Sequence, residues 1–278
     1  MAQLLNIPTA EYHRRPELSG SIAKTIIAKS ELHAWSEHPA YGGMAREETK
    51  LMDRGSAVGR MLLGKGAELA CLPFDDWRTK AAQESRDKAR AAGLVPLTHV
   101  EYTEYEEATK AIKTRLCEMG HFISDVTGVS EPVIIWEEES PYGPVGCRCM
   151  MDHLSLQRAT IYELKVVGDA HPDKTERSAE AMGYRISAAA YIRALAAYRP
   201  DLIGSITFQF LFVEPFEPFA IYAPPPSEEF LVSGDRDWTS AVARWARAKR
   251  DNYWPGYENA RSITRPRYAI RKEGYSNE

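Results

Sequence analysis

The chain has 278 residues, of which 44% are hydrophobic and 27% are charged, and its formal net charge is −4. This composition is typical of a globular protein with a sizeable core, and it excludes a disordered or strongly basic protein. No apolar run approaches the roughly 18 residues of a membrane-spanning helix, and the first residues lack a signal-peptide pattern. We therefore expect a cytoplasmic protein with no membrane contact, whose four cysteines are small buried residues rather than disulfide or zinc ligands.

The first half of the chain is predicted to be helical, because apolar residues recur at helical spacing. Strand-like segments follow, rich in β-branched and aromatic residues and separated by turn residues. A crossing helix, two further strands and a last helix complete the order. The expected helices span 21–35, 53–70, 76–93, 103–120, 178–198 and 228–251, and the expected strands span 131–139, 145–156, 159–167, 205–214 and 216–226.

No internal repeat or low-complexity linker interrupts this order. We therefore expect a single α/β domain over residues 1–278, with a central mixed β-sheet flanked by helices. Its parts would be a helical N-terminal portion at about 1–125, a sheet-containing core at about 126–250 and a basic tail at about 251–278.

Three charged residues stand out in two consecutive predicted strands: Asp152 in the first, and Glu163 and Lys165 in the second. Side chains alternate along a strand, so Glu163 and Lys165 share a face, and a hairpin would bring Asp152 beside Glu163. Two neighbouring carboxylates repel unless a cation lies between them, and Mg²⁺ prefers such oxygen ligands. Two interpretations remain open, a divalent metal site assisted by Lys165 or a modest surface salt bridge. The apolar residues around both segments favour partly buried charges that need a partner or an ion.

This arrangement resembles the PD-(D/E)xK nuclease core and, more narrowly, the RecE/exonuclease VIII-like exonucleases of phages and prophages. The resemblance rests on short segments in the same order along most of the chain: RGSAVGRMLL, SEPVIIW, CRCMMD, ELKVVGDA, GYRISAAAY, FLFVE and YWPGY. It implies a restriction-endonuclease-like core and metal-dependent hydrolysis of double-stranded DNA from its 5′ ends. It also implies a 3′ overhang passed to a single-strand annealing protein, and a homo-oligomeric ring around the DNA.

The resemblance also assigns roles to residues of this chain. Asp152 and Glu163 become ligands of Mg²⁺, for which Mn²⁺ would substitute, together with the backbone carbonyl of Leu164. Lys165 becomes the catalytic lysine. Glu131, at the family's acidic position before the hairpin, is a further candidate ligand.

Four supporting positions depart from the family pattern. Gly59 stands where the family has a histidine, and Ser187 where it has a glutamine. Met150 replaces an arginine and Val166 a threonine. Because loss of one such group weakens metal binding by roughly 10–100-fold, a second interpretation is a catalytically weakened or inactive protein that acts as a DNA-binding recombination partner.

Five further residues are expected to contact DNA. Tyr184 and Ser187 share a face of the crossing helix and would approach the metal or a phosphate, with core packing as the alternative for the tyrosine. Arg148 shares a strand face with the first carboxylate of the hairpin. Arg261 and Arg265 belong to a basic C-terminal stretch that would either bind phosphates or form a solvated helix face and tail.

Overall fold

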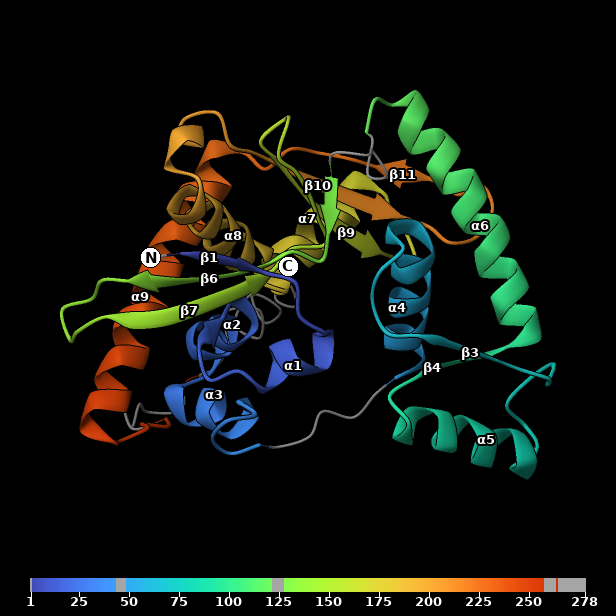
Figure 1. Ribbon diagram of the computed structural model, residues 1–278, viewed down its shortest axis with the longest axis horizontal. Helices are drawn as coiled ribbons and strands as arrows, with labels where there is room; N and C mark the ends of the chain where they lie inside the picture. The colour runs from blue at the N-terminus through green and yellow to red at the C-terminus, as the bar shows by residue number, and fades with distance from the viewer. Residues whose placement is uncertain (1, 44–48, 122–127, 258–263, 265–278) are drawn as a thin grey trace, which may run out of the picture.

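The computed structural model describes residues 2–43, 49–121, 128–257 and 264 (Figure 1). The strands are β1 (Gln3–Leu5), β2 (Leu18–Ser19), β3 (Leu69–Leu72), β4 (Val95–Thr98), β5 (Gly128–Ser130), β6 (Val133–Glu138), β7 (Val145–Met150), β8 (His153–Ser155), β9 (Thr160–Val166), β10 (Thr207–Val213) and β11 (Ile221–Tyr222). The helices are α1 (Thr9–Arg14), α2 (Gly20–Ala28), α3 (Glu31–Glu37), α4 (Lys50–Leu63), α5 (Lys80–Ala91), α6 (His99–Glu118), α7 (Pro172–Ala181), α8 (Tyr184–Tyr198), the 3₁₀ helix η1 (Pro200–Leu202) and α9 (Glu228–Asp251). This is the expected mixed α/β architecture, with helices packed around the sheets.

The strands of the described residues form three sheets. Their orders are β1-β6-β7-β2, β11-β10-β9-β8-β5 and β3-β4. Both larger sheets mix parallel and antiparallel pairs, because β2 is parallel to β7 and β10 is parallel to β9. No helix in these residues is both long and apolar enough to cross a bilayer.

Two paired segments, β5–β6 and β7–β8, bend together where they pass from one large sheet to the other. β7 pairs with β6 in the first sheet, whereas β8 pairs with β5 and β9 in the second. Met151 and Asp152 lie between β7 and β8, opposite Glu131 and Pro132. The N–H of Glu131 donates to the carbonyl of Asp152 (3.0 Å), and the N–H of Met151 donates to that of Pro132 (3.2 Å). The two segments, β5–β6 and β7–β8, therefore stay paired through the bend.

The bend has local causes. Pro132 has no N–H to give to a regular ladder. Glu131 adopts φ 50°, in the left-handed region that residues other than glycine seldom occupy. The single strand predicted over 145–156 is therefore two strands, because an alternation pattern carries no information about a change of sheet.

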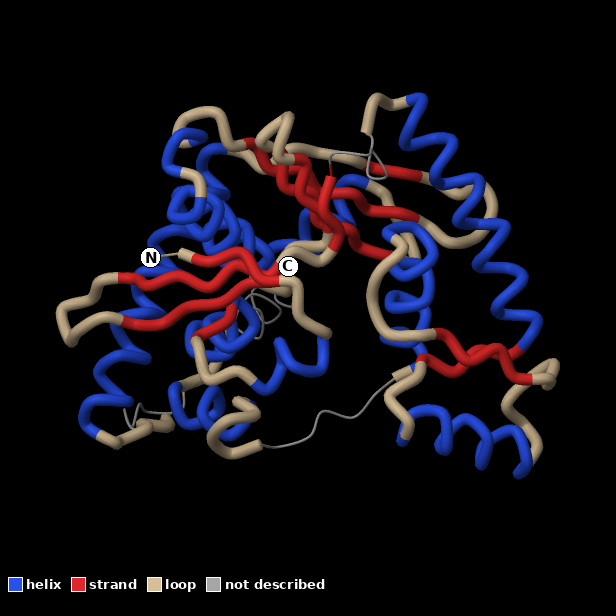
Figure 2. The backbone as a smooth tube through the Cα atoms, in the orientation of Figure 1, coloured by secondary structure: helices blue, strands red, loops and turns tan. Residues whose placement is uncertain are grey.

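Strands β9 and β10 form the parallel centre of the five-stranded sheet and are connected through α7 and α8 (Figure 2). Glu163 lies opposite Phe210, and Lys165 lies opposite Phe212. One face of these strands packs into a core with α2, α8 and α9, and the other face packs against α4 and α6. The sheet is thus covered on both faces, as is usual for parallel strands.

Helices α8 and α9 cross at close range beside the four-stranded sheet. A Cβ atom at Gly234 would lie 2.1 Å from the carbonyl oxygen of Arg185, so only glycine fits at this crossing. The fully buried Trp238 stacks on Trp136 of β6, with ring centroids 5.8 Å apart. Both indole N–H groups donate to Glu138, at distances of 3.3 and 2.8 Å.

Helices α4, α5 and α6 gather with the β3-β4 sheet at one end of the molecule, on the right in Figure 1. α4 begins after Thr49, whose side chain accepts from the N–H of Met52, and ends at Gly64 in the left-handed conformation (φ 72°). Among the described residues of the N-terminal part, which was predicted to be helical, there are four short strands. They have two to four residues each, which is too few to show a period of two in the sequence.

Candidate active site

The bend between the two sheets opens onto a cleft of about 400 Å³ beside α4. The lining includes Glu131 and Asp152 from the bend, Lys165 from β9 and Gly59 from α4. The fold therefore joins residues that lie more than a hundred positions apart in the chain.

The three charged residues singled out in the sequence lie together, and two of them, Asp152 and Lys165, line this cleft. Oδ2 of Asp152 accepts a 2.7 Å hydrogen bond from the backbone N–H of Leu164, which holds the carboxylate against β9. Nζ of Lys165 donates to Oε1 of Glu163 (2.5 Å) and to the carbonyl of Leu164 (3.2 Å). Oε2 of Glu163 is buried and has no hydrogen-bond partner among the described residues. One buried acceptor of the cluster is thus left without a donor.

The charges of the cluster shift each other's titration. Burial raises the pKa of Asp152 to about 7 and the Glu163 carboxylate adds to the rise, while the Lys165 ammonium and the Leu164 N–H oppose it. Burial by itself would lower the pKa of Lys165, but the carboxylates of Glu163 and Asp152 outweigh it and raise that pKa above its usual value. Lys165 is therefore an ammonium at neutral pH. A carboxyl group that resists ionisation beside a second one marks a place where further positive charge is favoured.

Glu131 lies at the rim of the same cleft. Its Oε2 accepts a hydrogen bond of 3.3 Å from the hydroxyl of Thr9. A Cβ atom at Gly66 would lie 3.2 Å from Oε1, so the glycine makes room for this carboxylate. The charge of Glu131 also contributes to the raised pKa of Asp152. The left-handed backbone at Glu131 thus delivers a third carboxylate to the cleft.

Part of the wall formed by α4 consists of small residues. Gly55, Ser56 and Gly59 line the cleft, and no atom lies within 4 Å of a Cβ built at either glycine. The resemblance seen in the sequence matches Gly59 to a histidine. The space for a larger side chain is therefore present, but the side chain is not.

Two cations of the cleft were not recognised in the sequence. Arg60 pairs with Glu68 (2.7 Å) and donates to the carbonyl of Gly64 (2.9 Å), and Lys65 donates to the side chain of Asn6 (3.1 Å). Both residues line the cleft from the end of α4 and the loop after it. Nothing in the local pattern shows that this helix end faces the hairpin, since the contact is between distant parts of the chain.

Arg148 does not lie in the cleft, and its predicted contact with DNA is corrected by the structure. The residue is 2% exposed. Its Nε donates to the carbonyl of Glu17 (3.0 Å), another guanidinium nitrogen donates to the carbonyl of Tyr12, and the guanidinium lies 4.6 Å from the Tyr12 ring centroid. Arg148 therefore joins β7 to the N-terminal segment, because its guanidinium N–H groups donate to backbone carbonyls of that segment.

Ser187 is likewise buried away from the cleft, which corrects its predicted role. It is 5% exposed and packs against α2, where a Cβ at Gly20 would lie 3.3 Å from its hydroxyl oxygen. Tyr184 lies closer to the charged cluster: its ring centroid is 5.2 Å from Nζ of Lys165. Arg261 and Arg265 lie outside the described residues.

The comparison with protein families gives a match over residues 33–266 to a model described as a PDDEXK-like domain of unknown function, DUF3799. The chain belongs to this family. Membership confirms the PD-(D/E)xK part of the resemblance seen in the sequence, and it covers both the bend and α4.

Solved structures support the same fold. A protein from Eubacterium rectale, provisionally described as an exonuclease, is similar over 96% of this chain and 98% of its own chain, with 13% identity and a TM-score of 0.61. A phage-related exonuclease from Haemophilus somnus 129PT matches over 85% of this chain and 96% of its own, with 13% identity and a TM-score of 0.35, which is too low to support an argument. The curated proteins give no match.

Nucleases of the PDDEXK type generally use divalent metal ions, so the donors at the bend can be compared with that need. Within the described ranges, no three His, Cys, Asp or Glu side chains are grouped as a ready-made metal cluster. Mg²⁺ requires only one or two carboxylates, because waters complete its octahedron. Asp152 and Glu163 supply two, the carbonyl of Leu164 is a further oxygen, and the unpartnered Oε2 of Glu163 is a buried acceptor. These residues fit a hard divalent cation.

Proposed function

We propose that this PDDEXK-like protein is a Mg²⁺-dependent exodeoxyribonuclease that degrades linear double-stranded DNA from its 5′ ends. The observation that carries the proposal is the cluster of Asp152, Glu163 and the Lys165 amine, joined by hydrogen bonds through Leu164 at an open cleft. Two close carboxylates can hold a divalent cation. The cation and the amine together would offset the negative charge of the reacting phosphate during phosphodiester hydrolysis.

The residues of the chain would divide the work as follows. Asp152, Glu163 and the carbonyl of Leu164 would hold Mg²⁺ or Mn²⁺, which supplies Lewis acidity and an activated water. Lys165 would donate a hydrogen bond to a non-bridging phosphate oxygen as charge develops there. Its raised pKa favours this role over that of a general base, because the amine keeps its proton at neutral pH. Glu131 would be a further ligand of the metal ion, and the cleft cations Arg60 and Lys65 would contact the phosphates of the strand.

The proposal extends to the setting of the reaction. A processive 5′-to-3′ exonuclease would leave a 3′ overhang for a single-strand annealing protein in phage-type recombination, and a homo-oligomeric ring would hold the duplex during repeated cleavage. We place this activity in the cytoplasm. Native mass spectrometry of the purified protein, with and without duplex ends, tests the ring separately from catalysis.

The decisive experiment measures nucleotide release from linear duplex DNA with Mg²⁺ at pH 8. Wild type should release nucleotides, EDTA should stop the release, and Lys165→Ala should slow it by about 100-fold or more. Lys110→Ala is the matched control, because Lys110 is an exposed lysine of α6 that pairs with Glu106. Blocked 5′ ends should protect the substrate, and blocked 3′ ends should not. Equal rates for wild type and Lys165→Ala would show that the cluster is not the active site.

A second candidate function is favoured by the glycine at position 59. A cleft that lacks the family's histidine would bind metal weakly, and the protein would then bind DNA without cutting it. Calorimetry with Mn²⁺ separates the two functions. Metal binding that disappears in Asp152→Asn supports the nuclease, whereas intact DNA affinity without metal binding supports the non-catalytic partner.

A further inference from the structure

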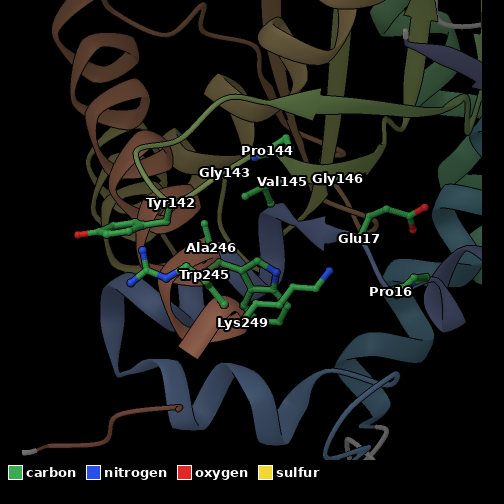
Figure 3. Close-up of a pocket in the computed structure, with 11 residues that line it drawn as sticks. Pro16, Glu17, Tyr142, Gly143, Pro144, Val145, Gly146, Trp245, Ala246 and Lys249 are labelled. Carbon is green, nitrogen blue, oxygen red and sulfur yellow. The ribbon is translucent and has the colours of Figure 1, made fainter. Parts of the chain in front are cut away.

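A second pocket of about 400 Å³ lies at the opposite end of β7 from the candidate active site (Figure 3). The turn after β6, the segment around Glu17 and the C-terminal half of α9 form its walls. Val145 lines this pocket and Met150 lines the cleft. At about 3.3 Å per residue, five steps of a strand put the two sites about 17 Å apart. The pocket is therefore separate from the carboxylate cluster.

An indole N–H that no described residue accepts faces this pocket, where solvent reaches it. Trp245 is 1% exposed, and no described residue accepts a hydrogen bond from its indole N–H. The other two deeply buried indoles, those of Trp136 and Trp238, both donate to Glu138. Figure 3 shows the Trp245 side chain at the floor of the pocket next to that of Lys249. Water in the pocket can accept from this N–H, and a ligand oxygen that replaces the water would keep the hydrogen bond.

Lys249 supplies a positive charge beside that donor. It lies one helical turn after Trp245, is exposed, and has no ion-pair partner in the described part of the chain. Two acids lie nearby, but each has its own arginine: Arg15 pairs with Glu17 (2.7 Å) and Arg250 pairs with Asp251 (2.8 Å). The ammonium is thus the unbalanced charge of the pocket.

An aromatic surface completes the rim. Tyr142 is 37% exposed, and the guanidinium of Arg250 lies 4.9 Å from its ring centroid. A ring and a guanidinium in this arrangement form a flat surface on which a nucleobase can stack. Basic residues in the last turn of a helix also offset its dipole, which accounts for Lys249 and Arg250 but not for the unpartnered N–H of Trp245.

We propose that this pocket binds a nucleotide, with its phosphate held by the Lys249 ammonium and the Trp245 N–H. The base stacks on the surface made by Tyr142 and Arg250. The nucleotide is either a free nucleoside monophosphate or the terminal nucleotide of a strand, because both present the same phosphate and base. This binding needs no metal, and it does not depend on the proposed nuclease activity.

The test is isothermal titration calorimetry of the full chain with deoxyadenosine monophosphate in EDTA, so that neither metal nor turnover contributes. Lys249→Gln should weaken binding by about five- to tenfold, since it removes a charge-assisted hydrogen bond. Trp245→Phe should weaken it by about fivefold while keeping a ring in place. Lys110→Gln on α6 makes the same change at an exposed lysine outside the pocket and should leave affinity unchanged.

Further arms locate the site and identify the source of the phosphate. Asp152→Asn and Lys165→Ala should bind the nucleotide as wild type does; loss of binding in either places it in the cleft and overturns the proposal. Binding by wild type that Lys249→Gln leaves unchanged, or no binding at all, also overturns it. Inorganic phosphate should bind more weakly than the nucleotide, and equal affinity would remove the role of the base. A short deoxyadenosine oligonucleotide that binds more tightly than the monophosphate, and loses the gain in Lys249→Gln, assigns the pocket to a strand.

Discussion

The backbone N–H of Leu164 donates a 2.7 Å hydrogen bond to Oδ2 of Asp152, and this bond ties the bent ribbon to strand β9. Asp152 and Glu163 meet here, so ionisation of both carboxyl groups opposes folding of the metal-free protein. The raised pKa of Asp152 means that this cost appears as pH rises from about 4 to 7 and is complete at pH 8. Asp152→Asn keeps an acceptor for Leu164 and removes the charge. We expect it to increase the free energy of unfolding in EDTA at pH 8 by about 1–3 kcal/mol, measured by urea denaturation.

Wild type and Asp152→Asn also test whether Asp152 binds the metal ion. Addition of Mn²⁺ should raise the urea midpoint of wild type and should have little effect on Asp152→Asn, because binding to the folded state stabilises it. Asp87→Asn, at an exposed acid of α5 that pairs with Arg86, is the control and should respond to Mn²⁺ as wild type does. A variant that is less stable in EDTA and still gains from Mn²⁺ would contradict the assignment of Asp152.

Gly59 offers a way to add the side chain that the cleft lacks. Because a Cβ at this position meets no atom within 4 Å, Gly59→Ala should stabilise α4 by about 0.5–1 kcal/mol through helix propensity alone. Gly59→His should bind Mn²⁺ about tenfold or more tightly than Gly59→Ala, since an imidazole would join the oxygen donors. Calorimetry of the two variants isolates the ligand effect from the helix effect. Equal affinity in both variants would show that position 59 is too far from the metal.

The local sequence was sufficient to predict the charged cluster. Alternation along two strands and the spacing of Asp152, Glu163 and Lys165 led to one shared site, and the structure places these three side chains together. The mixed α/β fold also followed from the order of helical and strand-like segments. Both are features in which the pattern near each residue carries the information.

The failures concern contacts between distant segments. Arg148 was predicted to contact DNA because it shares a strand face with Asp152, but its guanidinium donates to backbone carbonyls of the N-terminal segment. Ser187 was placed in the site, yet α2 packs over it. The cations Arg60 and Lys65 were missed for the same reason, since only the folded chain brings the end of α4 to the hairpin. Strand alternation and helix periodicity do not report which element covers a given face.

Replacement of Gly234 by alanine is expected to cause a large loss of stability. A Cβ at this position would lie 2.1 Å from the carbonyl oxygen of Arg185, and the Arg185–Asp237 ion pair (2.8 Å) holds the two helices at that distance. Gly234→Ala should therefore separate α8 from α9 and reduce the free energy of unfolding by about 3 kcal/mol or more, despite the higher helix propensity of alanine. Thermal denaturation measures the effect, with Val232→Ala at a 63% exposed position of α9 as the control. A neutral or stabilising result would mean that the two helices cross further apart.

The buried ring of His38 is expected to make the protein less stable at mildly acidic pH. The ring is fully buried against Tyr41 and Trp245, its Nδ1 accepts from the N–H of Ala40 (3.1 Å), and its Nε2 lies 3.4 Å from the carbonyl of Glu17. This pairing fits the neutral ring, with the proton on Nε2. Burial lowers the pKa of His38 to about 4, although the Glu17 carbonyl opposes the shift. The unfolded chain therefore binds a proton between about pH 6.5 and pH 4 that the folded chain does not.

This difference in proton binding makes the folded state less stable as the pH falls. The contribution of His38 is constant above about pH 6.5 and is lost as the pH falls toward 4, by on the order of 1–3 kcal/mol. His38→Gln should be less stable than wild type at pH 8, because it loses aromatic contacts, but the gap should narrow at pH 5. Urea denaturation at the two pH values measures this gap, and His99→Gln at an exposed histidine of α6 controls for the general effect of acid. A gap of the same size at pH 8 and pH 5 would show that folding does not change the pKa of His38.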